Sequence, residues 1–168
     1  LLNNMNNTIN IVDFSYNYLG NEGATIIANA LPTNIKKTSF NANVIAIRDN
    51  CIGFEGALAI ANALLNNNTV TNLCLTNNVI GIQGVIAIAN ALSNNDTVRL
   101  LWLSGTKMGP KGFEAIYKTL LTNYTITDLD YSRFELNEED GYRSNYTNWL
   151  MNEVYGLLNR NKRLYRLS

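Results

Sequence analysis

The fold is decided by one stretch, residues 69–92, which reads TVTNLCLTNNVIGIQGVIAIANAL. In its first half Val70, Leu73 and Leu75 alternate with polar residues, as expected of a short strand with one buried face. Its second half is a run of Val, Ile, Ala and Leu with the spacing of a helix that buries one side. The stretch therefore predicts one strand followed by one helix.

The segment between the strand and the helix contains the residue types that turns require. Asn78 ends the strand, and its side chain is suited to bond the backbone of its own turn and of the next turn along the stack. Gly81 tolerates a bend or a positive φ. We expect Gly84 to open a helix over residues 85–92, whose alanines allow close approach to the strands.

The strand and helix pattern recurs along the chain. A unit of this size cannot bury a core alone, so its repetition predicts units that stack and share one core. We place the repeats near 8–34, 42–68, 70–97, 98–125 and 126–160. The step from the first to the second repeat is longer than the others, which predicts either a loop near 36–40 or an irregular strand that begins at Phe40. In the fourth repeat Thr106 replaces the turn asparagine and is expected to bond its own turn less well.

This pattern resembles the leucine-rich repeat of the ribonuclease-inhibitor type, whose form is LxxLxLxxNxIGxxGxxxLAxAL. Here it is carried by Val70-x-x-Leu73-x-Leu75-x-x-Asn78-x-Ile80-Gly81-x-x-Gly84 and the following AIANAL. The resemblance implies an α/β solenoid with a curved parallel sheet on its concave face and helices on its convex face. NOD-like receptors, tropomodulins and secreted effectors of intracellular bacteria have similar repeats.

Residues 137–168 are predicted to form a C-terminal cap, because the fifth repeat has lost its glycines to Asn137 and Asp140, and Phe134 occupies its asparagine position. We expect a helix over 137–159, started by Asn137 or a neighbouring acidic residue. Its apolar side consists of Trp149, Leu150, Val154, Leu157 and Leu158. The basic residues 160–168 are predicted to form a short edge strand, whose charge either deters aggregation or provides a second partner site.

The composition excludes several classes of function. The chain has 13 basic and 13 acidic residues, so no net field recruits nucleic acid or anionic membrane. No secretory or membrane-spanning apolar run is visible. Cys51 and Cys74 fall five positions apart in the repeat register, which argues against a disulfide and favours a reducing, intracellular compartment. The chain starts LLNN, without Met, and we expect a fragment that lacks upstream residues.

Asn-x-Thr sequons fall in the loop before three of the predicted strands. Asn67, Asn95 and Asn123 lie where a glycan is sterically possible. The alternative is that a repeat loop rich in Asn and ending in Thr produces sequons without any modification.

The outward residues of the strands are the candidate binding site, since the resemblance implies that partners bind on the concave face. The predicted contacts are Asp13, Tyr16, Arg48, Asp49, Cys74, Trp102, Asp128, Asp130 and Arg133. Trp102 is either an interface anchor or a cover over neighbouring side chains. Cys74 has no visible base to lower its pKa and is expected to be inert.

Catalysis is not predicted. Asp128 and Asp130 share one face of a strand about 7 Å apart, but the chain has no histidine to complete a site, and Arg133 is near enough to neutralise one carboxylate. We therefore expect no catalytic residue, no bound metal and no cofactor.

The sequence predicts a scaffold that binds a protein partner, with a secreted bacterial effector in the host cytoplasm as one form of this prediction. The alternative is a GTPase-activating or other enzyme-regulating protein of this repeat type. A monomer is expected, and the alternative is end-to-end association through an uncapped first repeat.

Overall fold

The structure is a computed structural model, which describes residues 10–32, 42–132 and 145–167. In these residues five short strands alternate with five helices. The strands are β1 (Ile11–Asp13), β2 (Val44–Ala46), β3 (Asn72–Cys74), β4 (Leu100–Trp102) and β5 (Asp128–Asp130). The helices are α1 (Gly20–Ala30), α2 (Phe54–Leu64), α3 (Gly81–Leu92), α4 (Gly109–Thr122) and α5 (Asn145–Tyr165).

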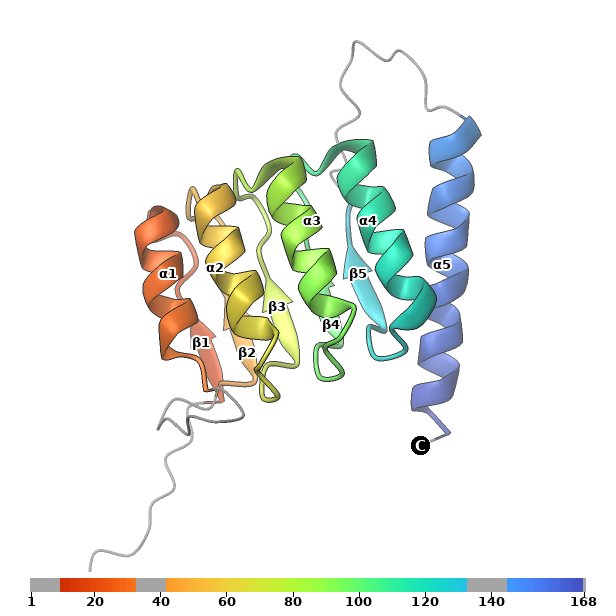
Figure 1. Ribbon diagram of the computed structural model, residues 1–168, viewed down its shortest axis with the longest axis horizontal. Coiled ribbons are helices and arrows are strands. Elements are labelled where there is room, and N and C mark those ends of the chain that lie inside the picture. Colours follow the sequence, from red (N-terminus) through yellow and green to blue (C-terminus); the bar gives the residue numbers. More distant parts are fainter. Residues whose placement is uncertain (1–9, 33–41, 133–144, 168) are drawn as a thin grey trace, which may run out of the picture.

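The strands form one parallel sheet in chain order, β1-β2-β3-β4-β5. The helices α1 to α4 lie side by side over one face of this sheet, and α5 lies at its C-terminal end beside α4 (Figure 1). Because each strand continues through a helix to the neighbouring strand, the chain is an α/β leucine-rich-repeat solenoid, as predicted.

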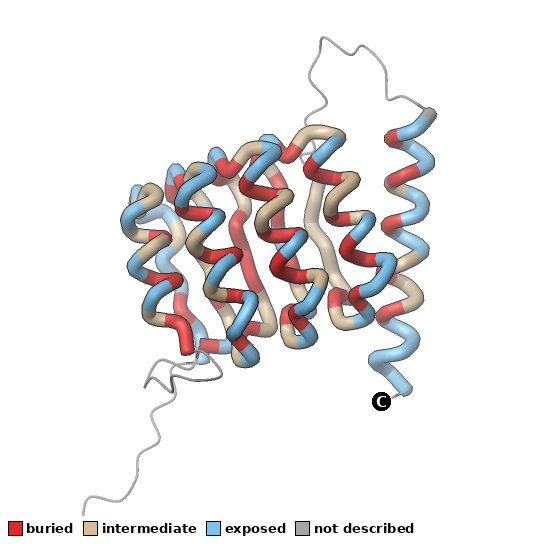
Figure 2. The backbone as a smooth tube through the Cα atoms, viewed as in Figure 1, coloured by how far each residue is buried: buried red, intermediate tan, exposed pale blue. Residues whose placement is uncertain are grey.

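The core lies between the sheet and the row of helices, where buried segments of both face each other (Figure 2). In the repeat that contains residues 69–92, the core side chains are at most 2% exposed; they are Leu73, Leu75, Ile80, Ile88 and Leu92. Burying one such side chain stabilises the fold by about 1.5–3 kcal/mol before entropy is counted. These are the columns that the sequence pattern assigned to the core.

Asn78 ties two repeats together. Its Nδ2 donates to the carbonyl oxygens of Leu75, in its own turn, and of Ile47, in the preceding one, both at 2.9 Å. Its Oδ1 accepts from the backbone N–H groups of Asn50 at 3.1 Å and Ile52 at 3.0 Å. The predicted bond of the turn asparagine to its own turn is confirmed, but the other turn that it bonds is the preceding one and not the next one along, as was predicted.

Thr106 occupies the same position in the next repeat. It is buried, and its hydroxyl donates to the carbonyl of Leu103 in its own turn at 2.7 Å. A hydroxyl has a single proton to donate, whereas an amide has two. The substitution therefore satisfies the local carbonyl, as expected.

The predicted start of the helices is wrong by one turn. Helix α3 begins at Gly81, whose φ is +70°, rather than after Gly84. Gly84 lies inside the helix, where an added Cβ would meet the Cβ of Ala57 on α2 at 3.1 Å. Its function is close packing of α3 against α2. The first turn escaped prediction because Ile82 and Gln83 are exposed and break the apolar pattern.

The expectation that the sequon asparagines are accessible is also wrong. Asn67, Asn95 and Asn123 are between 4% and 7% exposed. The Nδ2 of Asn95 donates to the carbonyls of Leu64 and Asn67, and that of Asn123 to the carbonyls of Leu92 and Asn95. A glycan on these nitrogens is incompatible with the fold, because each nitrogen belongs to a buried side chain and already donates two hydrogen bonds, in Asn67 to the carbonyl of Pro32 and the hydroxyl of Thr69.

The C-terminal residues do not form the predicted edge strand, since α5 continues to Tyr165. Asn161, on this helix, continues the series of buried asparagines formed by Asn67, Asn95 and Asn123. Its Nδ2 donates to the carbonyls of Asn123 at 3.0 Å and Ile126 at 2.7 Å. Arg160 donates to the carbonyl of Leu120 at the end of α4 at 2.7 Å. These bonds explain why the polar segment after residue 159 stays helical.

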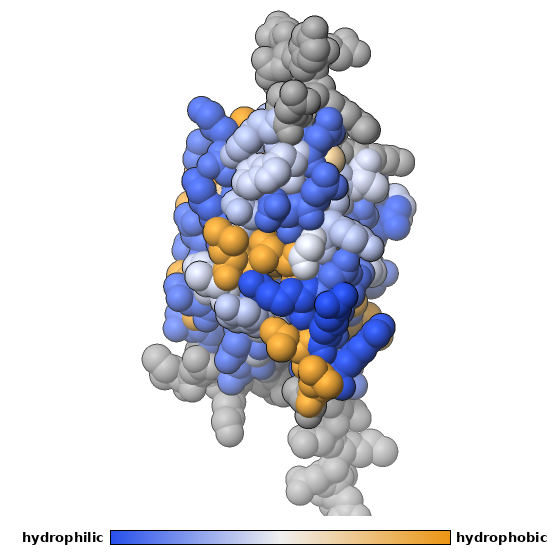
Figure 3. Space-filling model, turned by 90° about the vertical axis from the view of Figure 1, so that its right-hand side faces the viewer, coloured by the Kyte–Doolittle hydropathy of each residue, from blue (hydrophilic) through white to orange (hydrophobic). Residues whose placement is uncertain are grey.

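The inner side of α5 is apolar, with Leu150, Val154 and Leu158 buried. Its outer side mixes hydrophobic and strongly hydrophilic groups towards the C-terminus (Figure 3). The predicted helix start at Asn137, the positions of Phe134 and Asp140, and the loop or strand near 36–40 lie outside the described residues.

Candidate functional site

The concave face is the face of the sheet that none of the described helices covers. In the strand register Asp13, Ala46, Cys74, Trp102 and Asp130 are successive partners across the sheet. We call these five residues the central column of the sheet. They lie side by side because the strands pair in phase with the repeat.

A groove of about 540 Å³ runs along this column. It is lined by Asp13, Ser15, Ala46, Arg48, Cys74, Thr76, Asn77, Trp102, Ser104, Asp130 and Ser132. Five of the nine predicted contact residues are among these, while Tyr16, Asp49 and Asp128 are not. Arg133 lies outside the described residues.

At the β1–β2 end of the groove, the charges neutralise one another. The Nε of Arg48 lies 3.2 Å from Oδ2 of Asp49, and Asn77 donates to the other oxygen of Asp49 at 3.1 Å. The same guanidinium lies over the ring of Tyr16, 4.9 Å from its centroid, and donates to its hydroxyl. Hydrogen bonding to Asp49 raises the pKa of Arg48.

Asp13 lies on β1 at the same end of the groove. The adjacent hydroxyl of Ser15 and its backbone N–H, which donates to Oδ1 of Asp13 at 2.9 Å, lower the pKa of the carboxyl group, and the positive charge of Arg48 adds to this effect. Burial opposes the shift weakly. The Asp13 carboxylate is therefore held in its charged form by its own strand end.

At the β4–β5 end, an aromatic ring stands beside two carboxylates. Trp102 is 39% exposed, and its indole Nε1–H donates to Oδ1 of Asp128 at 3.4 Å. Asp130 is the register partner of Trp102, and its Oδ1 accepts from the backbone N–H of Ser132 at 3.0 Å. Among the described residues, neither carboxylate has a cation within 4.0 Å, since the ion pairs found there are Arg48–Asp49 and Glu114–Lys118.

The two cysteines are free, as the register argument predicted. Cys74 is 5% exposed although it lies on the concave face, and its Sγ lies 3.7 Å from the hydroxyl of Thr76. No group of three or more metal-ligating side chains occurs in the part of the chain that the structure describes. Of the helices described, none is long and apolar enough to cross a membrane.

Small polar residues complete the groove, and the list of predicted contacts omitted them. Ser104 and Ser132 share a hydrogen bond of 3.1 Å between their hydroxyls, and Thr76 lies in the same column. The repeat register placed these residues correctly on the concave face. They were omitted because charged and aromatic side chains were preferred as predicted contacts.

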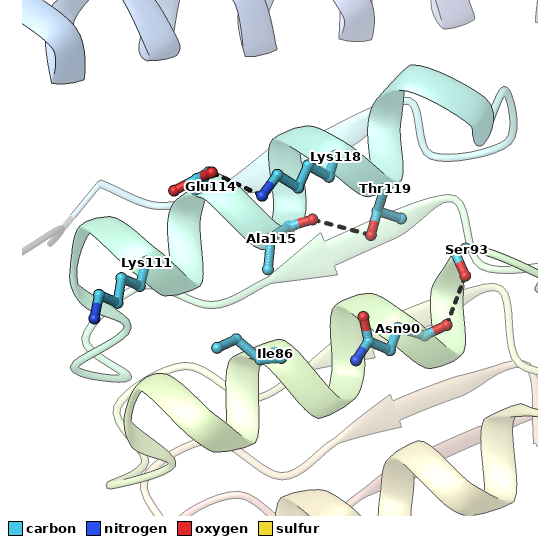
Figure 4. A pocket seen from close by; sticks show the side chains of 8 residues that line it. All are labelled: Ile86, Asn90, Ser93, Lys111, Glu114, Ala115, Lys118 and Thr119. Carbon is cyan, nitrogen blue, oxygen red and sulfur yellow. Dashed lines mark hydrogen bonds and ion pairs between the residues drawn. The ribbon is translucent and has the colours of Figure 1, made fainter.

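A second groove, of about 410 Å³, lies on the convex side between α3 and α4. Figure 4 shows Ile86 and Asn90 of α3 across from the pair that Lys118 forms with Glu114 on α4, at 2.8 Å. This hydrogen bond raises the pKa of Lys118. Because the lysine is already paired within its own helix, this groove is the weaker candidate.

Comparisons with known proteins agree with this architecture. A family model described as "Leucine Rich repeat" matches residues 6–28 and 66–89. The solved structure of the Leiomodin-1 Actin-Binding Site 2 is 28% identical, with a TM-score of 0.79, and the similarity covers 96% of this chain and 86% of that one. The C-terminal domain of tropomodulin from Caenorhabditis elegans, at 10% identity, has a TM-score of 0.72 over 94% of this chain and 87% of that one.

The comparison with curated proteins finds no match. The likeness to an actin-binding site supports a role in protein–protein interaction. Taken with the repeated strand, asparagine turn and helix, these findings support a leucine-rich-repeat protein of the ribonuclease-inhibitor type.

Proposed function

We propose that this chain is a binding module without catalytic activity, whose concave face contacts a protein partner. The observation that carries the proposal is the groove along the central column of the sheet, which holds the half-exposed Trp102 between polar and charged side chains. An aromatic side chain surrounded by polar groups is the usual composition of an interface anchor and its rim.

Actin is the first partner to test. The support is the similarity to the Leiomodin-1 Actin-Binding Site 2, which extends over 96% of this chain. The identity of 28% leaves most surface side chains different, so the fold can be shared while the contacts are this chain's own.

The experiment is a calorimetric titration of the purified chain with monomeric actin. The proposal predicts saturable binding at a stoichiometry of one to one. A functional complex would form at about 100 μM actin. If no heat of binding is measured at that concentration, actin is excluded as the partner. Captures from lysate would then be the route to another protein partner.

We further propose that the chain acts inside a cell, in the host cytoplasm if it is a bacterial effector. A translocation reporter fused to the chain tests this directly. The enzyme-regulating alternative has a separate readout, because a GTPase activator would accelerate nucleotide hydrolysis by a small GTPase above its intrinsic rate.

A further inference from the structure

We propose that Trp102, Asp128 and Asp130 form a binding site for a guanidinium group, and that the partner presents an exposed arginine to it. This inference rests on the proposed function, because it names the chemistry by which the concave face recognises its partner. It places the contact at the β4–β5 end of the groove rather than along its whole length.

The first argument is the arrangement of the three side chains. Asp128 and Asp130 are two residues apart on β5 and therefore point to the same face of the sheet, about 7 Å apart. The indole of Trp102 is hydrogen-bonded to the first and lies opposite the second in the register. A planar guanidinium can stack on such a ring while its N–H groups reach carboxylates at its edge.

The second argument is the hydrogen-bonding capacity that this end leaves unused. An ionised carboxylate accepts about four hydrogen bonds. Among the described residues, Asp128 accepts one from the indole and Asp130 one from the backbone of Ser132, both at Oδ1. No group of the described residues takes up the Oδ2 atoms, and a cationic donor gains the most from them.

The third argument is that the chain itself pairs arginine with aromatic rings in this way. Arg48 lies over Tyr16 and bonds Asp49 on the same concave face. Arg99 lies over Tyr165, 4.4 Å from the ring centroid, and donates to its hydroxyl at 2.6 Å. The β4–β5 end has the ring and the carboxylates, while no arginine of the described residues occupies it. A partner's arginine would complete the same arrangement.

The stacking surface favours arginine over lysine. An ammonium group is a compact, strongly hydrated charge, whereas a guanidinium is flat, more weakly hydrated and able to bond two carboxylates at once. The site therefore selects a residue type, which a charge-only interaction with an acidic patch would not do.

The test uses the indole signals of the folded chain in a ¹⁵N-correlated NMR spectrum. The chain has two tryptophans, so Trp149 on α5 is an internal control, assigned by Trp149→Phe. The probe is N-acetyl-arginine methylamide, and its neutral isostere is the citrulline derivative. We expect the Trp102 signal to shift saturably with the arginine probe alone, while the Trp149 signal stays in place.

The variant Asp128→Asn/Asp130→Asn keeps the shape of the site and removes its charge. We expect this double variant to bind the arginine probe at least about tenfold more weakly. Equal shifts with citrulline, an unchanged response in the double variant, or equal movement of both indole signals would each overturn the proposal. Binding that appears only after Arg133→Gln would also overturn it, since the chain's own arginine would then be the occupant.

The probe experiment contains no actin, so it fails or succeeds independently of the partner. If actin binds and the double Asn variant binds it equally well, the proposed function stands and the guanidinium site is wrong. If the probe binds and actin does not, the site stands and the partner is a different protein.

Discussion

The indole Nε1–H of Trp102 donates to Oδ1 of Asp128 at 3.4 Å, so the ring is fixed by a neighbouring strand while 39% of it remains exposed. A residue that serves mainly to cover the core would be expected to lose its exposure. We infer that the ring is oriented for contact with a partner, at little benefit to the fold.

Trp102→Ala is therefore expected to cost the fold little. We predict a loss in the free energy of unfolding of about 1 kcal/mol, against about 3 kcal/mol for Leu101→Ala, because only the latter empties a fully buried position. Urea unfolding followed by circular dichroism measures both. A larger loss for Trp102→Ala than for Leu101→Ala would support the reading of Trp102 as a core cover.

Asn78 should be among the most sensitive polar residues. Asn78→Ala removes bonds to three carbonyls and two backbone N–H groups from a fully buried side chain. Since each unsatisfied buried group costs about 1–3 kcal/mol, we predict a loss of at least about 3 kcal/mol. The control is Asn62→Ala on the exposed side of α2, which should change stability by less than about 0.5 kcal/mol. Equal losses of stability in the two variants would refute the role of the turn asparagine in tying two repeats together.

Two helical glycines should respond in opposite directions to alanine. Gly84→Ala places a Cβ against Ala57 and Ile80 and is expected to destabilise the fold despite the better helix propensity of alanine. Gly156 on α5 has nothing within 4 Å of the added Cβ, so Gly156→Ala should stabilise by up to about 1 kcal/mol. Thermal unfolding of both variants tests the prediction, and stabilisation by Gly84→Ala would contradict the packing argument.

Arg160 is predicted to be structural, unlike the other basic residues near the C-terminus. Its guanidinium bonds the carbonyl of Leu120 and lies 4.2 Å from the ring centroid of Tyr124. We expect Arg160→Ala to lower stability by about 1–2 kcal/mol, while Arg163→Ala, at an exposed position, leaves it unchanged. Chemical denaturation measures both changes in stability. A neutral Arg160→Ala would contradict the structural role and leave Arg160 as a candidate for the second partner site.

The repeat period explains why the concave face could be predicted from sequence. Ala46, Cys74, Trp102 and Asp130 follow one another at steps of 28 residues, and parallel pairing keeps equal positions side by side. The register of the sheet is therefore already present in the sequence. Side-chain pairing between columns, such as that of Arg48 with Tyr16, is not periodic and required the structure.

The end of the C-terminal helix was predicted too early for a physical reason. Asn161 and Arg160 are polar, so a hydrophobic pattern ends before them. In the structure both bond backbone carbonyls at the end of α4 and in the loop that follows it. Burial of polar residues through bonds to another segment leaves no periodic signal. The same reasoning applies to the sequon asparagines, whose bonds to the preceding repeat make them internal.

The central claim, that the concave face is the binding surface, is tested most directly by comparing actin affinities of three proteins. These are the natural chain, Trp102→Ala/Asp130→Arg on the groove, and Trp149→Phe on α5 as the matched control, each first shown to be folded. The account predicts that the groove variant binds at least about a hundredfold more weakly, as expected for loss of an anchor and reversal of a charge, while the control is unchanged. Equal affinity of the groove variant and the natural chain would contradict it and move the binding surface away from the sheet.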